Sequence, residues 1–421
     1  MQLEIICTGD EVLTGKTINT NFSYMSQKLA DVGLAVRWET TVGDDRESLL
    51  HAFQLASQRA DAVIVNGGLG PTIDDLSQEI AAQAAGVELV FNEEWFTRME
   101  DFFRRRSRVM PPNNRKQAML PATAEIIDNP IGTACGFAVD IGRARFFFTP
   151  GVPRELRRML EEQIIPRLLQ KSGLQAAIHL KRFHSYGLGE SHVDALLQGV
   201  ESLVPGVKLG FRAHYPQLET KLTVRGRDMD DVRAKLAPVE REVRKRLGNF
   251  IMAEDDQTLE SVILAELTKR QGSLAIVETF TGGHITARLA PIPGAEQIVR
   301  RGIVSRDLGE VYAGVGLDGA SPSGELTRET AEAVAQAARR RTGATHALAV
   351  LIDLDDGPDR IDFGGTICLA IATAEGAESR RSRILGGREW VRLGASEMGL
   401  DCLRRQLQGL PVYERIDFEK T

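Results

Sequence analysis

Short apolar runs alternate with longer amphipathic segments over the first 170 residues. The apolar runs predict strands at 3–7, 36–42 and 62–66, and the amphipathic segments predict helices at 21–29, 46–57 and 75–85. Apolar strands that alternate with helices are typical of a mainly parallel sheet covered by helices on both faces. Residues 1–170 are therefore predicted to form an α/β domain.

The pattern changes twice further along the chain. Residues 171–255 are predicted to form a small α+β domain, with strands at 178–183, 208–211 and 219–224 and a polar helix at 230–246. Residues 253–256 are expected to form a linker. Residues 256–421 are predicted to form a second α/β domain, with strands at 274–278, 347–352 and 366–372 and helices at 259–269, 327–341 and 390–407.

Composition narrows the class of protein. The chain has 421 residues, which is too long for one ordinary domain, and its 43% hydrophobic and 26% charged residues are typical of a globular protein. No window offers the roughly 18 unbroken apolar residues of a membrane span, so no membrane association is expected. The net charge of -6 disfavours a general nucleic-acid binder, and no nucleic-acid partner is expected.

The four cysteines are Cys7, Cys135, Cys368 and Cys402. They are far apart and form no CxxC pair, which excludes a disulfide framework and a zinc knuckle. The chain opens directly with strand-like sequence and has no basic leader. A cytoplasmic location is therefore expected.

The most informative stretch follows the predicted strand at 62–66. It consists of Gly67, Gly68, Leu69, Gly70, Pro71, Thr72, Ile73, Asp74 and Asp75. Ligands bind at the carboxyl ends of parallel strands, and glycines let backbone N–H groups approach a phosphate closely. Asp74 and Asp75 suit a divalent cation bridging to phosphate oxygens, or a base that orients water. The alternative is a tight turn in which Asp75 caps the next helix.

Three further polar segments are candidates for the same edge of the sheet. After the first strand come Gly9, Glu11, Asn19 and Asn21, where the two asparagines could bond a ribose or a base; the alternative is that Asn21 only caps a helix. Arg115 and Lys116 could neutralise phosphate charge. The remaining candidates are Asn129, Gly132, Pro150, Gly151 and Glu155. Turn formation explains the glycines and prolines of these segments, but not the charged residues beside them.

These motifs occur in an order that resembles one known family. The strings are GDEVLTG at 9–15, GGLGPTIDD at 67–75, NNRKQA at 113–118, NPIGTA at 129–134 and PGVPRE at 150–155. They resemble the N-terminal domain of the CinA (competence/damage-inducible) family, a molybdopterin-binding-like fold. The resemblance extends over the whole chain, because 171–255 is similar to the small middle domain of that family and 256–421 to its C-terminal nicotinamide-mononucleotide (NMN) deamidase domain.

The resemblance implies a function for the first domain. It implies metal-dependent hydrolysis of ADP-ribose or a related nucleotide diphosphate, a small-molecule nucleotide substrate and a homodimer. The usual Nudix box is absent, so Asp74, Asp75 and either Glu11 or Asp44 would have to hold the divalent metal ion.

The last domain departs from the family pattern where the chemistry lies. Active deamidases carry Glu-Ser-Cys-Thr-Gly-Gly, whereas this chain has Thr279 in the serine position, followed by Thr281, Gly282 and Gly283. The segment at 302–311 lacks the tyrosine and lysine of the family, and 351–358 is acidic where the family has a glycine-rich loop. The lysines in 257–421 are Lys269 and Lys420 alone, and arginine cannot act as a general base near neutral pH. Arg388 and other scaffold residues are retained, so a degenerate deamidase domain is expected.

The sequence leaves three alternative functions open. Thr279 could act as the nucleophile of a working NMN deamidase if a base takes its proton. The first domain could bind molybdopterin or a nucleotide without turnover. A competence or DNA-repair adaptor is suggested by the family name, but neither charge nor motif supports it.

Overall fold

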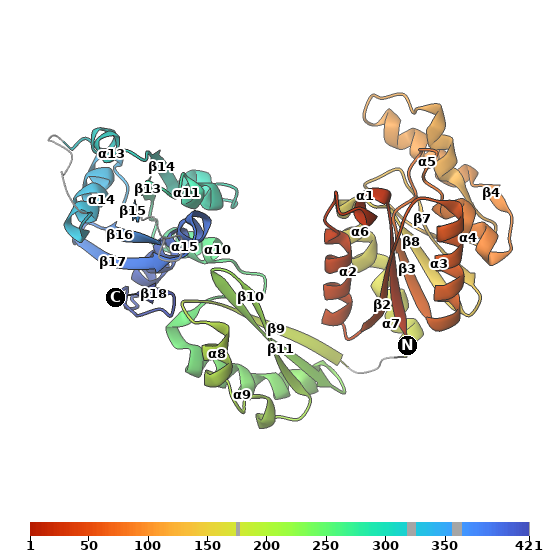
Figure 1. The fold of residues 1–421 in the computed structure, drawn as a ribbon, viewed down its shortest axis with the longest axis horizontal. Coiled ribbons are helices and arrows are strands. Elements are labelled where there is room, and N and C mark those ends of the chain that lie inside the picture. The colour runs from red at the N-terminus through yellow and green to blue at the C-terminus, as the bar shows by residue number, and fades with distance from the viewer. Residues whose placement is uncertain (174–176, 318–325, 356–363, 421) are drawn as a thin grey trace. The chain divides into compact units, whose positions relative to one another are not determined.

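The computed structural model describes residues 1–173, 177–317, 326–355 and 364–420. The chain divides into two compact units, 1–179 and 180–421 (Figure 1). Among the described residues, no helix combines the length and the apolar character that crossing a bilayer requires.

A six-stranded sheet forms the centre of the first unit. Its order is β2 (Val36–Val42), β1 (Leu3–Thr8), β3 (Ala62–Asn66), β8 (Ala144–Thr149), β7 (Gly136–Ile141) and β6 (Glu125–Ile127). The first four strands are parallel, and β7 and β6 continue the sheet antiparallel. The predicted mainly parallel sheet is confirmed, and the antiparallel edge is an addition.

Alternating side chains of β1 and β3 pack against helices on opposite faces. Ile5 and Ile64 contact the cluster built by α2 (Thr20–Asp31), α6 (Pro153–Met159) and α7 (Ile165–Ser172). Ile6 and Val65 contact the cluster built by α3 (Arg46–Arg59) and α4 (Ser77–Ala85). In Figure 1, α2 and α6 lie on one side of the sheet and α3 and α4 on the other. This is the two-residue period expected of a strand buried on both faces.

The remaining elements of this unit lie around the sheet. They are α1 (Asp10–Leu13), a hairpin of β4 (Leu89–Phe91) and β5 (Met119–Pro121), α5 (Glu93–Arg104), and the 3₁₀ helix η1 (Pro112–Ala118); a π-helical turn, η2 (Leu160–Ile164), joins α6 to α7. The helix predicted at 75–85 begins two residues later, at Ser77.

The second unit begins with a four-stranded sheet of order β10 (Val207–His214), β11 (Gln217–Gly226), β9 (Ala177–Tyr186) and β12 (Ile251–Glu254). It is accompanied by α8 (Glu190–Leu196), α9 (Met229–Leu247) and the short 3₁₀ turns η3 (Glu201–Leu203) and η4 (Gly248–Phe250). The expected linker at 253–256 is not a loose connection. Ala253 and Glu254 belong to β12, and the Asp255 carboxylate accepts hydrogen bonds from Arg182 N and Lys181 Nζ.

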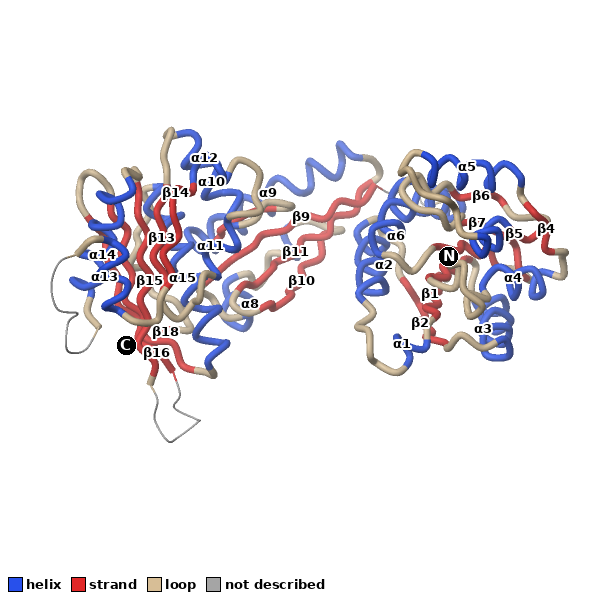
Figure 2. Tube along the Cα trace, turned by 90° about the horizontal axis from the view of Figure 1, so that it is seen from above, coloured by secondary structure: helices blue, strands red, loops and turns tan. Residues whose placement is uncertain are grey.

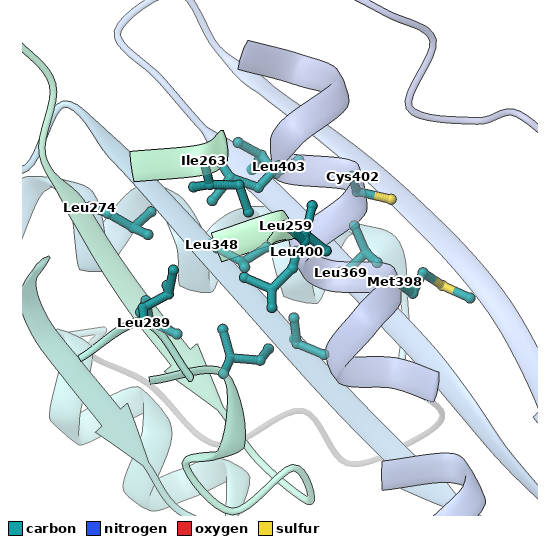
Figure 3. Packing of buried hydrophobic residues seen from close by; sticks show 14 of the residues in the cluster. Leu259, Ile263, Leu274, Leu289, Leu348, Leu369, Met398, Leu400, Cys402 and Leu403 are labelled. Atoms are coloured by element: carbon teal, nitrogen blue, oxygen red, sulfur yellow. The ribbon is translucent and has the colours of Figure 1, made fainter. Parts of the chain in front are cut away.

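A second six-stranded sheet completes this unit, with the order β14 (Val299–Val304), β13 (Leu274–Glu278), β15 (His346–Leu354), β16 (Gly364–Ala372), β17 (Ala377–Leu385) and β18 (Glu419–Lys420). Figure 2 shows β13–β16 side by side. The helices are α10 (Leu259–Lys269), α11 (His284–Leu289), α12 (Ala295–Ile298), α13 (Leu308–Val315), α14 (Arg328–Thr342) and α15 (Arg388–Gln408). Leu259 of α10 and Leu403 of α15 belong to one buried cluster with Leu369 of β16, and Figure 3 labels all three.

The two sheets of the second unit are joined by contacts at the tip of the β10–β11 hairpin. Tyr215 stacks on Trp390, with ring centroids 3.4 Å apart, and its hydroxyl donates to Trp390 O. Gln217 Nε2 donates to the buried carboxylate of Glu397, which also accepts from Arg288. A second joint lies at Asp417, which accepts hydrogen bonds from Gly189 N and contacts His192.

Replacing Phe148 by alanine is expected to destabilise the first unit by about 3–5 kcal/mol, because the ring is fully buried and packs on two neighbours. Its centroid lies 4.4 Å from that of Phe137 and 5.5 Å from that of Phe53. Scanning calorimetry of the full chain measures the shift. Val109→Ala, at a side chain that is 92% exposed, is the control and should leave the transition in place.

Candidate functional site

The first unit carries a pocket of about 430 Å³ at the carboxyl ends of β1, β3 and β8. Thirteen of the predicted site residues line it: Gly9, Glu11, Asp44, Gly67, Gly68, Leu69, Gly70, Pro71, Asp74, Asp75, Pro150, Gly151 and Glu155. Residues that were not predicted also line it, among them Thr8, Gln117, Thr133, Ala134 and Val152. The motifs that are distant in sequence therefore meet at one edge of the sheet.

Asn66, the last residue of β3, ties three of the pocket segments together. Its side chain is 5% exposed, and Nδ2 donates to Thr149 Oγ1 at 3.1 Å and to Pro150 O at 2.7 Å. Its Oδ1 accepts from Asn21 Nδ2 at 2.9 Å, and Asn21 also donates to Gly151 O at 2.7 Å. Asn66 was missed by the sequence reasoning because it looks like the ordinary end of a strand.

Asn19 and Asn21 do not line the pocket. Asn19 is the N-cap of α2 and accepts from Phe22 N at 2.9 Å, so the capping role assigned to Asn21 belongs to Asn19. Asn21 lies inside the helix and holds the loop at 150–151. Both asparagines position the backbone of the site, and a ribose or base contact by either one stays a prediction.

The glycine-rich loop after β3 takes a conformation that only glycine accepts easily. Gly67 and Gly68 have φ angles of +117° and +68°. A Cβ at Gly67 would lie 2.5 Å from Thr8 Oγ1, and one at Gly70 would lie 2.3 Å from Asp75 Oδ2. Gln117 Nε2 donates to Leu69 O at 3.0 Å and fixes the turn from the other side.

Asp74 and Asp75 have different roles in this loop. The Asp75 carboxylate accepts from Thr72 N at 2.8 Å and from Thr72 Oγ1. It does not cap α4, whose N-cap is Leu76 without a side-chain bond. Asp74 is exposed, and a hydrogen bond from Thr72, aided by the charge of Lys116, lowers its pKa. Asp74 therefore keeps its negative charge at the mouth of the pocket, while Asp75 holds the loop closed.

Asp44, one of the acidic residues that line the pocket, lies in a negatively charged environment. Burial raises the pKa of Asp44, and the negative charges of Asp10, Glu11 and Asp74 raise it further. Asp10 N donates to Asp44 Oδ2 at 3.2 Å, and Asp44 N donates to Asp10 Oδ1 at 3.3 Å. Negatively charged carboxylates that lie near one another repel, and a bound cation would relieve that repulsion.

No preformed metal cluster is present: within the described part of the chain, no three His, Cys, Asp or Glu side chains are arranged to hold an ion. Glu11, Asp44 and Asp74 nevertheless line the same pocket. Their oxygen atoms are the ligands that Mg²⁺ and Mn²⁺ prefer. The type of donor atom thus suits a hard divalent cation, although the three side chains are not arranged around one point, and Asp75 already accepts two bonds from Thr72.

Arg115 and Lys116 lie on η1 and separate in space. The Arg115 guanidinium lies 3.9 Å from the ring centroid of Phe91 and lines a different cavity, so it does not face the candidate site. Lys116 Nζ donates to Thr72 O at 2.5 Å and supports the glycine-rich loop from outside the pocket. Neither cation reaches the pocket wall in this structure.

Glu155, another acidic residue of the pocket lining, is held by Asn129. Asn129 is buried and donates from Nδ2 to Glu155 Oε2 at 2.7 Å and to Ala134 O at 2.9 Å, while its Oδ1 accepts from Gly132 N. A Cβ at Gly132 would lie 2.2 Å from Glu155 Oε2. Burial raises the pKa of Glu155. Asn129 and Gly132 thus shape the pocket from behind.

In the second unit, Glu278 organises the turn that follows β13. Its carboxylate is fully buried and accepts from Thr281 Oγ1, Ile285 N, and both Thr286 N and Oγ1, at 2.7–3.0 Å. Gly282 and Gly283 have positive φ angles and turn the chain into α11. Thr281 therefore has a structural role, and Glu278 was missed as its organiser.

Thr279 lies at the same strand end and is 5% exposed. Its Oγ1 accepts a hydrogen bond from Ile352 N at 2.9 Å. Lys269 lies on α10 and is paired with Glu266. Arg388 opens α15, on another element.

The acidic segment that replaces the family's glycine-rich loop is described only in part. Asp355 accepts two bonds from Arg383, and Asp356, Gly357 and Pro358 lie outside the described residues.

Each of the three parts of the chain matches a known protein family. Residues 4–170 match the family described as "Probable molybdopterin binding domain", residues 181–253 match "Damage-inducible protein CinA KH domain", and residues 256–407 match "CinA C-terminal domain". The small α+β domain is thus KH-like, although the loop at Gly187 lacks the GXXG signature and is contacted by Asp417.

Relatives of similar length cover almost the whole chain. A CinA-like protein from Shewanella sediminis is 40% identical over 98% of this chain and 97% of its own length. A protein from Shewanella oneidensis named nicotinamide-nucleotide amidohydrolase PncC is 38% identical over 97% of this chain and 96% of its own. A solved CinA structure from Thermoplasma acidophilum is 31% identical and covers 41% of this chain and 96% of its own, with a TM-score of 0.36.

Glu278→Ala is expected to destabilise the last domain by at least about 2 kcal/mol, because four donors would lose their buried acceptor. Calorimetric unfolding of the full chain measures the change. Glu296→Ala, at an exposed acid of α12, is the control. Equal stability of the two variants would contradict the role given to Glu278.

Proposed function

The chain belongs to the family of CinA-like proteins, and from that premise we propose that its N-terminal pocket hydrolyses the diphosphate bond of a small nucleotide, with ADP-ribose as the substrate. Water would add across one P–O–P bond and release AMP and ribose 5-phosphate. The observation that supports this best is the meeting of the glycine-rich loop with the carboxylates Glu11, Asp44 and Asp74 in one pocket.

The two halves of the pocket suit the two needs of this reaction. Backbone N–H groups of glycine-rich turns after a strand can approach phosphate oxygens closely. The carboxylates would repel a diphosphate unless a cation lies between them. Glu11, Asp44 and Asp74 would hold a divalent ion there. The ion would neutralise phosphate charge and lower the pKa of a bound water molecule.

The chain's own residues supply order and proton control. Asn66 and Asp75 fix the loops that line the pocket. Glu155, whose pKa burial raises, also lines the pocket and can donate a hydrogen bond to a phosphate oxygen when protonated. We further propose, from the family resemblance, that the protein acts in the cytoplasm as a homodimer.

Asp74→Asn is expected to lower ADP-ribose turnover by roughly 100-fold, because it removes a charged group from the pocket while the two hydrogen bonds from Thr72 to Asp75 still hold the loop. Chromatography of the products, with Mg²⁺ or Mn²⁺ added back after chelation, measures the rate. Asp140→Asn, at an exposed acid that lines none of the pockets described above, is the matched control.

Four results would separate the possibilities. Unchanged turnover in Asp74→Asn would contradict the proposal, and so would turnover that resists chelation. Tight binding of ADP-ribose by the wild-type protein without any product would favour the alternative of a nucleotide-binding or molybdopterin-binding protein. Asp75→Asn should also lose activity, but together with a lower unfolding temperature.

A second candidate function is NMN deamidation in the last domain, which the name of the Shewanella oneidensis relative favours. Thr279 would attack the amide carbon and ammonia would leave, followed by hydrolysis to nicotinic acid mononucleotide. Within the described part of the chain, Thr279 Oγ1 accepts from Ile352 N and donates to no base that could take its proton, which weighs against this function. The lysine expected of the family's Ser–Lys arrangement is also missing from 302–311.

We therefore expect the purified full chain to leave NMN intact under conditions in which it converts ADP-ribose. Ammonia release, followed by an enzyme-coupled assay, measures this. Ammonia that appears with the wild-type protein and disappears with Thr279→Ala would establish the second candidate function. The prediction that this domain is a degenerate deamidase would then be wrong.

A further inference from the structure

A second cavity of about 390 Å³ lies beside the candidate site, between α5 and the loop at 129–132. Figure 1 shows α5 at the same end of the sheet as α1. Three arginines line this cavity, Arg98, Arg105 and Arg106, together with the aromatic side chains of Trp95 and Phe102. A basic cavity of this size next to an acidic pocket has no part in the hydrolysis described above.

Two of the arginines have no acidic partner among the described residues. Arg98 pairs with Asp128 and lies over Trp95. The cavity's one acid, Asp101, pairs with Arg104 at 2.8 Å. Arg106 lies 3.5 Å from the ring centroid of Phe102 and donates only to Phe102 O, which leaves most of its N–H groups unused.

The Arg105 guanidinium makes no ion pair or hydrogen bond within the described part of the chain. Helix C-terminal placement alone would explain one such arginine, because a cation is favoured there. It does not explain why two unpaired guanidinium groups line one cavity. Such groups bind phosphate oxygens with directed, charge-assisted hydrogen bonds.

The two cavities share one wall. Asn129 and Gly132 line the arginine cavity, whereas Thr133 and Ala134 line the candidate site. Trp95 Nε1 donates to Thr133 O at 3.1 Å, and Asn129 donates to Glu155 across the wall. A ligand in the arginine cavity would therefore contact the loop that shapes the diphosphate site.

We propose that the arginine cavity binds the phosphate group of a nucleoside monophosphate through Arg105 and Arg106. The proposal deepens the proposed function, since it places a second phosphate-binding site for the same class of ligand against the wall of the first. Adjacent sites would let the protein hold a nucleotide at both, with Glu155 and Asn129 between them.

The test is calorimetric titration of the full chain with AMP and, separately, with adenosine. We expect AMP to bind and adenosine not to bind, and Arg105→Gln with Arg106→Gln to weaken AMP binding at least roughly tenfold. Arg104→Gln is the matched control, because Arg104 directly precedes Arg105 at the end of α5, is paired with Asp101 and does not line the cavity. Both variants should keep the wild-type unfolding temperature, since these side chains are exposed.

The outcomes are distinguishable from those of the hydrolase assay. Unchanged AMP affinity in the double variant, or absence of AMP binding to the wild-type protein, would overturn the proposal. Equal affinity for adenosine would overturn phosphate recognition. Asp74→Asn should keep the AMP affinity that depends on Arg105 and Arg106; if that affinity falls with Asp74→Asn but not with the arginine variants, AMP occupies the first pocket and the proposal fails.

Discussion

The geometry of the first unit depends on one buried amide at the end of the central strand β3. Asn66 cannot be exposed to water, so each of its polar atoms needs a partner, and the partners come from β8, from the loop after it and from α2. Those are the elements that carry PGVPRE and the first polar loop. The hydrogen bonds of this one side chain therefore fix how three distant segments meet, and the glycine-rich loop begins at the next residue in the chain.

The second unit has a similar arrangement at the end of β13, where the Glu278 carboxylate accepts hydrogen bonds from four donors of the turn and of α11. In both units a single polar group at a strand end determines the shape of the turn that follows.

This arrangement explains what could be predicted from sequence and what could not. The strands and helices of the first 85 residues follow from local periodicity, and the meeting of the motifs follows from the rule that parallel strands end at one edge. The roles of individual side chains depend on directions that spacing does not give. Arg115, Lys116 and Gln117 are consecutive on a 3₁₀ helix, where successive side chains diverge by about a third of a turn. They reach Phe91, Thr72 and Leu69 respectively, so residue type alone could not show which of them approaches the site.

Asn19 and Asp75 show the same limit for capping. A cap is defined by the backbone at one position, and a shift of two residues moves the role from Asn21 to Asn19. Asp75 has the residue type of a cap and stands close to α4, yet its bonds return to Thr72 inside the loop. Side-chain hydrogen bonds that close a turn compete with helix capping. The same residue types serve both roles, so the sequence alone does not show which role a residue has. The residues that line the pocket were thus easier to predict than the contacts that each of them makes.

The charges of the first unit are distributed unevenly around the loop at 129–134. On one side, burial raises the pKa of Asp44, and the negative charges of Asp10, Glu11 and Asp74 raise it further. On the other side, Arg105 and Arg106 lack acidic partners among the described residues. The two groups could have neutralised each other, but the wall held by Asn129 and Trp95 separates them. Keeping unlike charges apart costs stability, and proteins retain such arrangements where a ligand completes them. If the two proposals hold, a cation on the acidic side and a phosphate on the basic side would each remove an unfavourable field, and the wall would be the element that contacts both ligands.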